Sequence, residues 1–149
     1  MCRVMVIAEC CSNILPATPD RIRRFANAAM HAGADALKIQ LFLAQHFPEA
    51  ERHEKARVEF PREMLPRFVE IAKDEGLLAG ASVFDIVACT LLKLVGGDFI
   101  KLAAREEKNE GLRLLCSRSG LPILRSIVWT GATRVVSRAG EMTLACIPM

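Results

Sequence analysis

Strand-like runs and helical patterns alternate along the whole chain, and this alternation restricts the fold more than any other feature. Short apolar runs cover residues 4–9, 36–42, 77–84, 99–104, 122–128 and 142–147. The segments between them carry apolar residues at helical spacing. They begin near Thr18, Pro61, Asp85, Asn109 and Thr133 and end at Gly33, Gly76, Gly96, Gly120 and Gly140. Strands that alternate with helices of this length indicate βα units and a parallel sheet.

Two architectures are built from such units, and the sequence favours one of them. A doubly wound sheet usually has a glycine-rich turn after its first strand, whereas residues 9–19 read ECCSNILPATP, without a glycine. A complete (β/α) barrel has eight units and more than about 200 residues, and this chain has 149 residues. We therefore expect an α/β fold: an incomplete TIM-type (β/α) barrel with six parallel strands, in a single truncated domain over residues 1–149.

Composition argues against membrane and nucleic-acid partners. Hydrophobic residues make up 52% of the chain, yet no apolar run reaches the roughly 18 residues of a membrane span. The net charge of +3 comes from 20 basic and 17 acidic residues dispersed along the sequence. With one tryptophan and no tyrosine, the chain offers few rings on which bases could stack. We expect no membrane and no nucleic-acid partner.

The cysteines and histidines form no recognisable metal or disulfide pattern. The six cysteines stand at positions 2, 10, 11, 89, 116 and 146, without a C-x-x-C pair. The three histidines, at 31, 46 and 53, have no zinc-site spacing. We interpret the cysteines as reduced thiols of a cytoplasmic protein, and we expect no metal site from these residues.

Residues 43–60 interrupt the alternation. The segment reads LAQHFPEAERHEKARVEF and is long, charged and non-periodic. We expect a loop after the second strand. Long loops at this position of a barrel are commonly functional, and a solvated insert without a function is an equally good interpretation.

Charged and polar residues occur at the ends of several apolar strands. Lys38 and Gln40 share one face of the second strand, because side chains alternate across a strand. Lys101 lies in the fourth strand, Glu9 ends the first and Glu106 follows the fourth. Barrel enzymes carry their chemistry at the carboxyl ends of the strands. We therefore expect these five side chains to meet inside the barrel, at that end.

Two interpretations of the buried lysines remain open. An ammonium group at a barrel mouth can bind a phosphate or a carboxylate, or form a Schiff base with a carbonyl compound. Alternatively, the lysines form internal ion pairs, such as Lys101 with Glu9, that serve packing alone.

The same residues carry a resemblance to the N-acetylneuraminate synthase (sialic acid synthase) family across nearly the whole chain. The most specific match is GADALKIQLF at 33–42, where the family reads GADAVKFQTF. Further matching segments are AECCSNI at 8–14, ASVFD at 81–85, KLAARE at 101–106, GLPILRS at 120–126 and LACI at 144–147. The resemblance implies a barrel that condenses phosphoenolpyruvate with an N-acyl amino sugar, with the help of a divalent metal, typically manganese.

The resemblance also implies roles for individual residues. The catalytic positions are Glu9, Lys38 and Lys101, and the substrate-binding positions are Asn13, Gln40, Ser82 and Glu106. Lys38 would contact the enolpyruvate carboxylate, while Ser82 and Lys101 would contact its phosphate. Gln40 and Glu106 would hold the sugar.

The chain departs from the family pattern at several positions. Ile14 replaces a histidine and Ala104 replaces a serine, and the family's metal-binding histidines have no counterpart. We expect a degenerate or truncated relative that binds a small phosphorylated or carboxylated ligand at the strand ends. One alternative is an active phosphoenolpyruvate-dependent transferase completed by another chain, and the other is a non-catalytic structural module. An open barrel also exposes strand edges and an apolar inner face, so we expect a homodimer that covers them.

Overall fold

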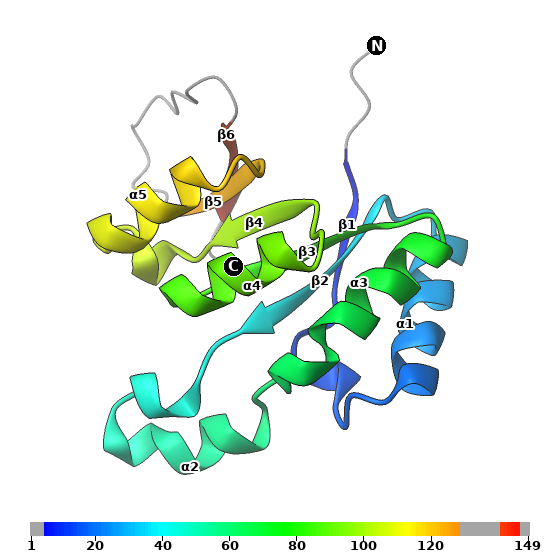
Figure 1. Cartoon of the computed structure of the whole chain (residues 1–149), viewed down its shortest axis with the longest axis horizontal. Helices are drawn as coiled ribbons and strands as arrows, with labels where there is room; N and C mark the ends of the chain where they lie inside the picture. Colours follow the sequence, from blue (N-terminus) through cyan, green and yellow to red (C-terminus); the bar gives the residue numbers. More distant parts are fainter. Residues whose placement is uncertain (1–4, 129–140, 147–149) are drawn as a thin grey trace.

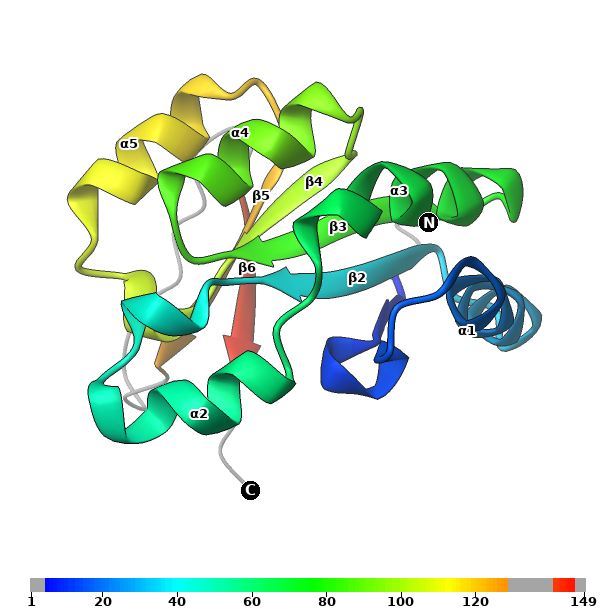
Figure 2. The same cartoon turned by 60° about the horizontal axis from the view of Figure 1, so that its bottom comes forward.

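The computed structural model describes residues 5–128 and 141–146, and its centre is a six-stranded parallel sheet (Figure 1). The strands are β1 (Ile7–Glu9), β2 (Ala36–Leu41), β3 (Leu78–Val83), β4 (Phe99–Leu102), β5 (Ile123–Val128) and β6 (Glu141–Cys146). Each strand pairs with the next one in the sequence, in the order β1-β2-β3-β4-β5-β6. A doubly wound sheet reverses its strand order, so the consecutive order and the curl seen in Figure 2 confirm the predicted incomplete barrel.

Helices follow the strands as the sequence predicts. They are α1 (Pro19–His31), α3 (Leu65–Asp74), α4 (Ile86–Leu94) and α5 (Glu110–Arg118). Side-chain oxygens of Thr18, Asp85 and Asn109 accept backbone hydrogen bonds at the starts of α1, α4 and α5. No helix in the described part of the chain is long and apolar enough to cross a membrane. The helix predicted between residues 133 and 139 lies outside the described residues.

The segment 43–60 is more ordered than the sequence predicts. Instead of a loop it contains a short 3₁₀ helix (Ala44–His46) and α2 (Glu49–Arg57), which extends beyond the carboxyl end of β2 in Figures 1 and 2. No residue of α2 is buried, so the helix has no apolar periodicity that could reveal it. Its charges nevertheless suit a helix, with Glu49 and Glu51 in the first turn and Lys55 and Arg57 in the last.

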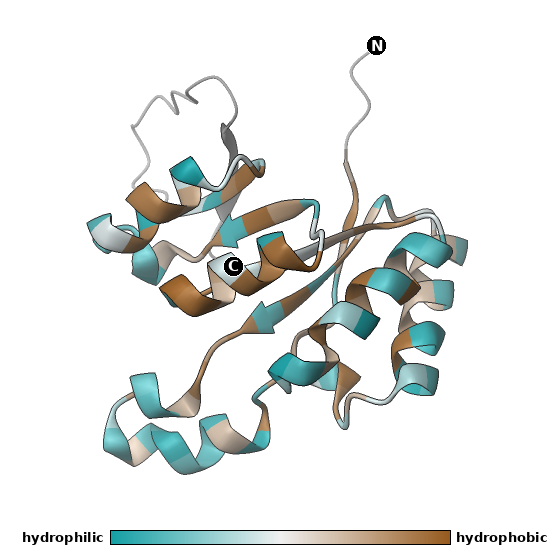
Figure 3. Cartoon of the chain, in the orientation of Figure 1, coloured by the Kyte–Doolittle hydropathy of each residue, from teal (hydrophilic) through white to brown (hydrophobic). Residues whose placement is uncertain are grey.

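The main apolar core lies between the sheet and the helices. The strand residues that face the helices include Leu37, Ile39, Ala81 and Ile100, all fully buried. In Figure 3 the strands and the inner sides of the helices are largely hydrophobic. Because side chains alternate across a strand, the residues between these positions face the inside of the curl.

The inner face carries its own apolar cluster, which corrects one expectation. Ala36, Phe99 and Leu124 are buried together, with Ile7 packed against them. The Phe99 ring lies directly against Gly80, where an added Cβ atom would come within 2.2 Å of the ring. Phe99 is only 3% exposed. The expected exposed apolar inner face is therefore wrong for these residues, because their own side chains cover it.

Candidate functional site

A layer of polar side chains lies above this apolar cluster, toward the carboxyl ends of the strands. The strand register places Gln40, Ser82 and Lys101 side by side on β2, β3 and β4. It places Glu9 beside Lys38 on β1 and β2. All five residues alternate with residues of the helix-facing core, so they point into the curl. We call Glu9, Lys38, Ser82 and Lys101 the amine layer.

Lys38 is the most enclosed charged residue of this layer, with 6% of its surface exposed. Its Nζ donates a hydrogen bond of 2.9 Å to Ser82 Oγ and forms an ion pair with Glu9 Oε2. Glu9 Oε1 accepts a second hydrogen bond, from the backbone of Cys11 at 3.1 Å. The internal lysine–glutamate pair that the sequence left as an alternative is thus present, although Lys38 forms it instead of Lys101.

The environment of Lys38 weakens its hold on a proton. Burial, and then the positive charge of Lys101, lower the pKa of Lys38 from 10.5 to about 7. The influence of Lys101 shows that the two lysines face a common space. The ion pair with Glu9 acts in the opposite direction, because a neighbouring carboxylate favours the ammonium form. An additional anion in this space would also favour the charged form of Lys38.

Glu106 lies at the end of the fourth βα unit, in a 3₁₀ turn (Ala104–Glu106) directly after β4. The residue is buried. Its Oε1 accepts a hydrogen bond from Arg105 Nε at 3.0 Å, and its Oε2 accepts one from Asn109 Nδ2 at 3.0 Å. Asn109 also caps α5 through its Oδ1 atom. The start of α5 therefore determines where this carboxyl group points.

Asn13 is the one predicted site residue that the structure does not connect to the others. It lies in a 3₁₀ turn (Cys11–Ile14) after β1 and is exposed. Its backbone oxygen accepts hydrogen bonds from Arg21 Nη2 at 2.8 Å and Nε at 3.3 Å. Among the described residues, no hydrogen bond joins the Asn13 side chain to the amine layer.

Sequence reasoning missed a group of aromatic rings and an arginine at the rim of the site. Phe42 makes edge contacts with Phe47 and Phe84, at centroid distances of 5.2 and 6.0 Å. The guanidinium of Arg105 lies 4.4 Å from the Phe47 centroid and 5.1 Å from that of Phe84. We call these four residues the aromatic rim. Phe42 and Phe84 each follow a strand directly, and this position was the available signal.

The segment 43–62 is fastened to the strand ends by polar contacts. Asp85 Oδ2 accepts a hydrogen bond of 2.5 Å from Arg62 Nη2 and lies 3.7 Å from His46 Nδ1. Glu59 Oε2 accepts a hydrogen bond of 2.7 Å from the backbone of Ala44. These contacts hold Phe47, and with it the aromatic rim, over the carboxyl ends of β2 and β3.

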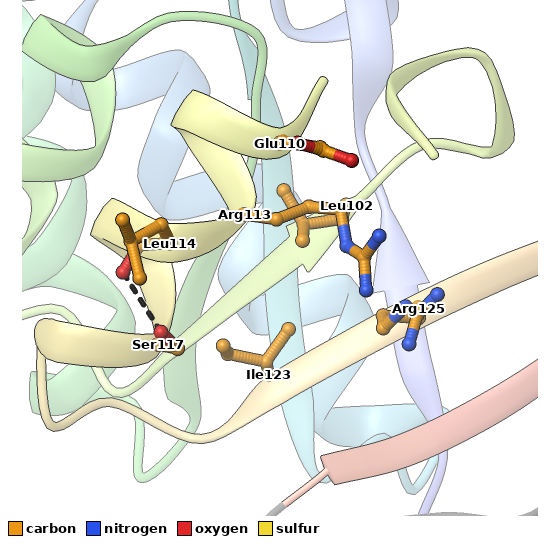
Figure 4. Close-up of a pocket in the computed structure, with 7 residues that line it drawn as sticks. All are labelled: Leu102, Glu110, Arg113, Leu114, Ser117, Ile123 and Arg125. Carbon is orange, nitrogen blue, oxygen red and sulfur yellow. Dashed lines mark hydrogen bonds between the residues drawn. The ribbon is translucent and has the colours of Figure 1, made fainter. Parts of the chain in front are cut away.

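A separate hollow of about 280 Å³ lies between α5 and the ends of β4 and β5 (Figure 4). Arg113 and Arg125 border it together with Leu102 and Ile123. Leu102 and Ile123 belong to the helix-facing core, so this hollow lies on the opposite side of the sheet from the amine layer.

The described residues do not supply the metal site that the resemblance implies. Within residues 5–128 and 141–146, no three histidine, cysteine, aspartate or glutamate side chains are grouped so that they could hold a metal ion. The donors of the amine layer are instead two lysines and a serine hydroxyl, which suit an anionic ligand.

Solved structures with the same fold are synthases and related barrel proteins. N-acetylneuraminic acid (sialic acid) synthetase from Leptospira borgpetersenii serovar Hardjo-bovis matches 99% of this chain and 55% of its own, with 20% identity and a TM-score of 0.80. The spore coat polysaccharide biosynthesis protein spsE of Bacillus subtilis matches 84% of this chain and 36% of its own, with 25% identity and a TM-score of 0.68. A truncated 3-deoxy-D-arabino-heptulosonate 7-phosphate synthase from Thermotoga maritima matches 86% of this chain and 41% of its own, with 15% identity and a TM-score of 0.64.

These comparisons define what is shared. The chain spans about half or less of the length of each of these proteins. The comparison with curated proteins gave no match. The model of the NeuB family matches residues 25–137, well over half of the sequence, and the chain therefore belongs to the NeuB family.

Proposed function

We propose that this chain is a partial or degenerate sialic-acid-synthase-like barrel that binds a small phosphorylated or carboxylated ligand, of the phosphoenolpyruvate type, in the amine layer. The observation that carries the proposal is the environment of Lys38, which is buried, bonded to Ser82 and close enough to Lys101 to lose affinity for its proton. The membership of the NeuB family supports it. The Leptospira relative was solved in complex with citrate, itself a carboxylated anion.

Binding requires an exchange of partners at Lys38. Glu9 now neutralises this lysine, but the Glu9 side chain is 38% exposed and can turn toward solvent. An incoming phosphate or carboxylate would then take its place and accept hydrogen bonds from Lys38, Ser82 and Lys101. Charge-assisted hydrogen bonds to such anions are about twice as strong as neutral ones.

Titration calorimetry with phosphoenolpyruvate tests the proposal. We expect saturable binding by the unmodified chain and a loss of about tenfold in affinity for Lys38→Met and for Lys101→Met, because each removes one cationic donor. Lys93→Met is the matched control, since Lys93 is exposed on α4, outside the amine layer. If the unmodified chain gives no binding heat with phosphoenolpyruvate or with sulfate, the proposal is wrong.

A non-catalytic role is the second candidate, and the Lys38–Glu9 ion pair favours it. The variant Glu9→Gln separates the two candidates. If Glu9 competes with an external anion, its neutralisation strengthens the binding of sulfate and phosphoenolpyruvate. If the pair serves packing alone, the same variant only lowers stability, because it leaves a buried ammonium without its counter-charge.

An active synthase completed by another chain is the remaining candidate, and the membership of the NeuB family is what favours it. In that case the protein would be a phosphoenolpyruvate-dependent transferase that forms a carbon–carbon bond. Incubation with phosphoenolpyruvate, manganese and N-acetylmannosamine should then release inorganic phosphate. A Lys38→Met sample should release none.

We also propose that the chain forms a homodimer in the cytoplasm. Among the described strands, β1 and β6 each have one neighbour, so the sheet has two open edges. Open edges tend to be covered by another chain. The four described cysteines are free thiols, as expected in a reducing compartment. Sedimentation velocity measures the assembly directly, and a monomer at all concentrations would contradict the dimer.

A further inference from the structure

The side chain of Arg105 is held in place by flat contacts. Its guanidinium lies over the rings of Phe47 and Phe84, at 4.4 and 5.1 Å from their centroids. Phe42 braces both rings through edge contacts. Arginine suits such a position because its planar cation stacks on aromatic faces. The aromatic rim therefore restricts where this guanidinium can lie.

The hydrogen-bonding capacity of Arg105 is only partly used. Its Nε donates to Glu106 Oε1 at 3.0 Å. Within the described part of the chain, neither Nη1 nor Nη2 donates a hydrogen bond, and 51% of the side chain is exposed. Two parallel N–H donors on a fixed plane form the geometry that binds a phosphate or carboxylate through two oxygens.

The aromatic rim lies directly beyond the amine layer on the same face. Phe84 follows Ser82 by two residues, and Phe42 follows Gln40 by two, so each phenylalanine has the inward orientation of the residue before it. A strand rises about 3.3 Å per residue, which puts the rings roughly 7 Å past the polar layer. A molecule bound between the two levels could thus contact Arg105 while its other end faces a ligand held by Lys38.

We infer that Arg105 binds the anionic group of the second substrate, so that the acceptor is a sugar carrying a phosphate or a carboxylate. The inference rests on the proposed function of the amine layer, where the enolpyruvate-type ligand binds. Arg105 determines specificity at a distance from the reacting atoms, because it contacts only the charged end of the acceptor. A neutral sugar of the same size leaves the two Nη atoms in water and gains nothing from them.

Paired titrations of the full chain test the inference. The probes are mannose 6-phosphate, galacturonate and neutral mannose, each titrated in the presence and absence of phosphoenolpyruvate. We expect at least one of the two anionic sugars to bind about tenfold more tightly than mannose, the scale expected for charge-assisted hydrogen bonds. Whichever sugar binds identifies the group as phosphate or carboxylate. The preference should weaken with added salt.

Substitutions at one position assign the effect. Arg105→Gln should abolish the preference for charged sugars without changing affinity for phosphoenolpyruvate or mannose. Arg105→Lys should keep only part of it, because lysine keeps the charge but lacks the planar pair of donors. Arg67→Gln is the matched control, since Arg67 lies on α3 and pairs with Glu70. If Arg105→Gln does not fold, the lysine variant and the preference of the unmodified chain still decide.

The outcomes separate the two proposals. Equal binding of charged and neutral sugars, with normal phosphoenolpyruvate binding, overturns the inference and leaves the amine layer intact. A preference that survives in both Arg105 variants also overturns it. Binding of an anionic sugar that depends on Arg105, without any binding of phosphoenolpyruvate, refutes the proposed function and reduces Arg105 to an isolated anion site.

Discussion

Lys38 and Ser82 are joined by a hydrogen bond of 2.9 Å that runs diagonally between β2 and β3. The strand register pairs Lys38 with Gly80, and Ser82 lies two residues closer to the carboxyl end. The lysine side chain therefore leans toward the mouth of the curl. The Phe99 ring occupies the space beside Gly80. An apolar floor thus forces the amine outward, toward the end where a ligand can enter.

The hydroxyl of Ser82 should contribute to both binding and stability. Ser82→Ala removes the acceptor of the Lys38 hydrogen bond in a site where Ser82 is only 2% exposed. We expect the free energy of unfolding to fall by about 1–2 kcal/mol. We expect affinity for phosphoenolpyruvate to fall about tenfold, because one donor to the phosphate is lost.

Chemical denaturation and calorimetry measure these two effects. Ser117→Ala is the control, because Ser117 is exposed on α5 and its hydroxyl bonds only to the nearby backbone of Leu114. It should change neither quantity appreciably. An unchanged affinity in Ser82→Ala would remove this hydroxyl from the binding site.

Anion binding should depend on pH through Lys38. With its pKa lowered to about 7, Lys38 is largely charged at pH 6 and largely neutral at pH 9. Sulfate is a suitable probe because it does not titrate in this range, and its affinity should fall as the pH rises through 7. Lys101→Met removes one of the two causes of the lowered pKa, so the midpoint should move upward in that variant. A flat profile for the unmodified chain would contradict this role of Lys38.

The same pKa also predicts how stability depends on pH. The folded chain releases the Lys38 proton near pH 7, whereas the unfolded chain keeps it up to its ordinary value of 10.5. The unfolded state therefore binds more protons between these two values, and stability should rise with pH across this window. Lys38→Met removes this contribution. The difference between the two denaturation profiles should have a slope of up to about 1.4 kcal/mol per pH unit.

The sequence predicts the sheet well because the strands and the packed helices carry strong local signals. Helix-facing residues such as Leu37 and Ile39 are fully buried, and glycines such as Gly33 and Gly76 end helices with positive φ angles of 79° and 75°. The shared orientation of Lys38 and Lys101 follows from the alternation of side chains alone. For these features, local periodicity and tertiary structure agree.

The parts that the sequence does not predict depend on contacts between distant segments. Helix α2 buries no residue, so no periodic pattern marks it. The ion pair of Lys38 with Glu9, in place of Lys101, depends on which strands are adjacent in the sheet. The aromatic rim needs Phe47 from the segment after β2 and Arg105 from the segment after β4. No local pattern connects such residues.

Asn109 should position Glu106 independently of its role as a helix cap. Its Oδ1 accepts from the backbone of Leu112 at 3.1 Å, and its Nδ2 donates to Glu106 Oε2 at 3.0 Å. Asn109→Ala loses both contacts and should cost about 1 kcal/mol or more of stability. Asn109→Asp keeps the cap but places a second carboxylate next to Glu106. It should therefore keep much of the helix stability and weaken sugar binding as strongly as the alanine variant.

These variants require two separate readouts. Thermal unfolding reports on the cap, and calorimetry with mannose and its 6-phosphate reports on Glu106. If Asn109→Asp binds sugars as the unmodified chain does, Glu106 does not depend on the amide for its position, and its assignment to the sugar site loses this support.

The close contact between Gly80 and Phe99 makes a final prediction about the floor of the site. A Cβ atom at position 80 would lie 2.2–2.4 Å from three ring atoms of Phe99, so the ring would have to move. Phe99 is packed against Ala36 and Leu124, which leaves it little room. Gly80→Ala should therefore lower the free energy of unfolding by about 1–3 kcal/mol.

Gly111→Ala provides the matched control for the same chemical change. Gly111 lies in the first turn of α5, and the nearest atom to its added Cβ would be Asn109 Oδ1 at 3.9 Å, an ordinary contact distance. Alanine favours a helix over glycine by up to about 1 kcal/mol, so this variant should be as stable as the unmodified chain or more so. Because the Phe99 ring supports Lys38 from below, Gly80→Ala should also weaken the binding of phosphoenolpyruvate, while Gly111→Ala should leave it unchanged. Equal stability of the two variants in denaturant unfolding would show that the inner apolar cluster is not packed as tightly as the contact between Gly80 and Phe99 implies.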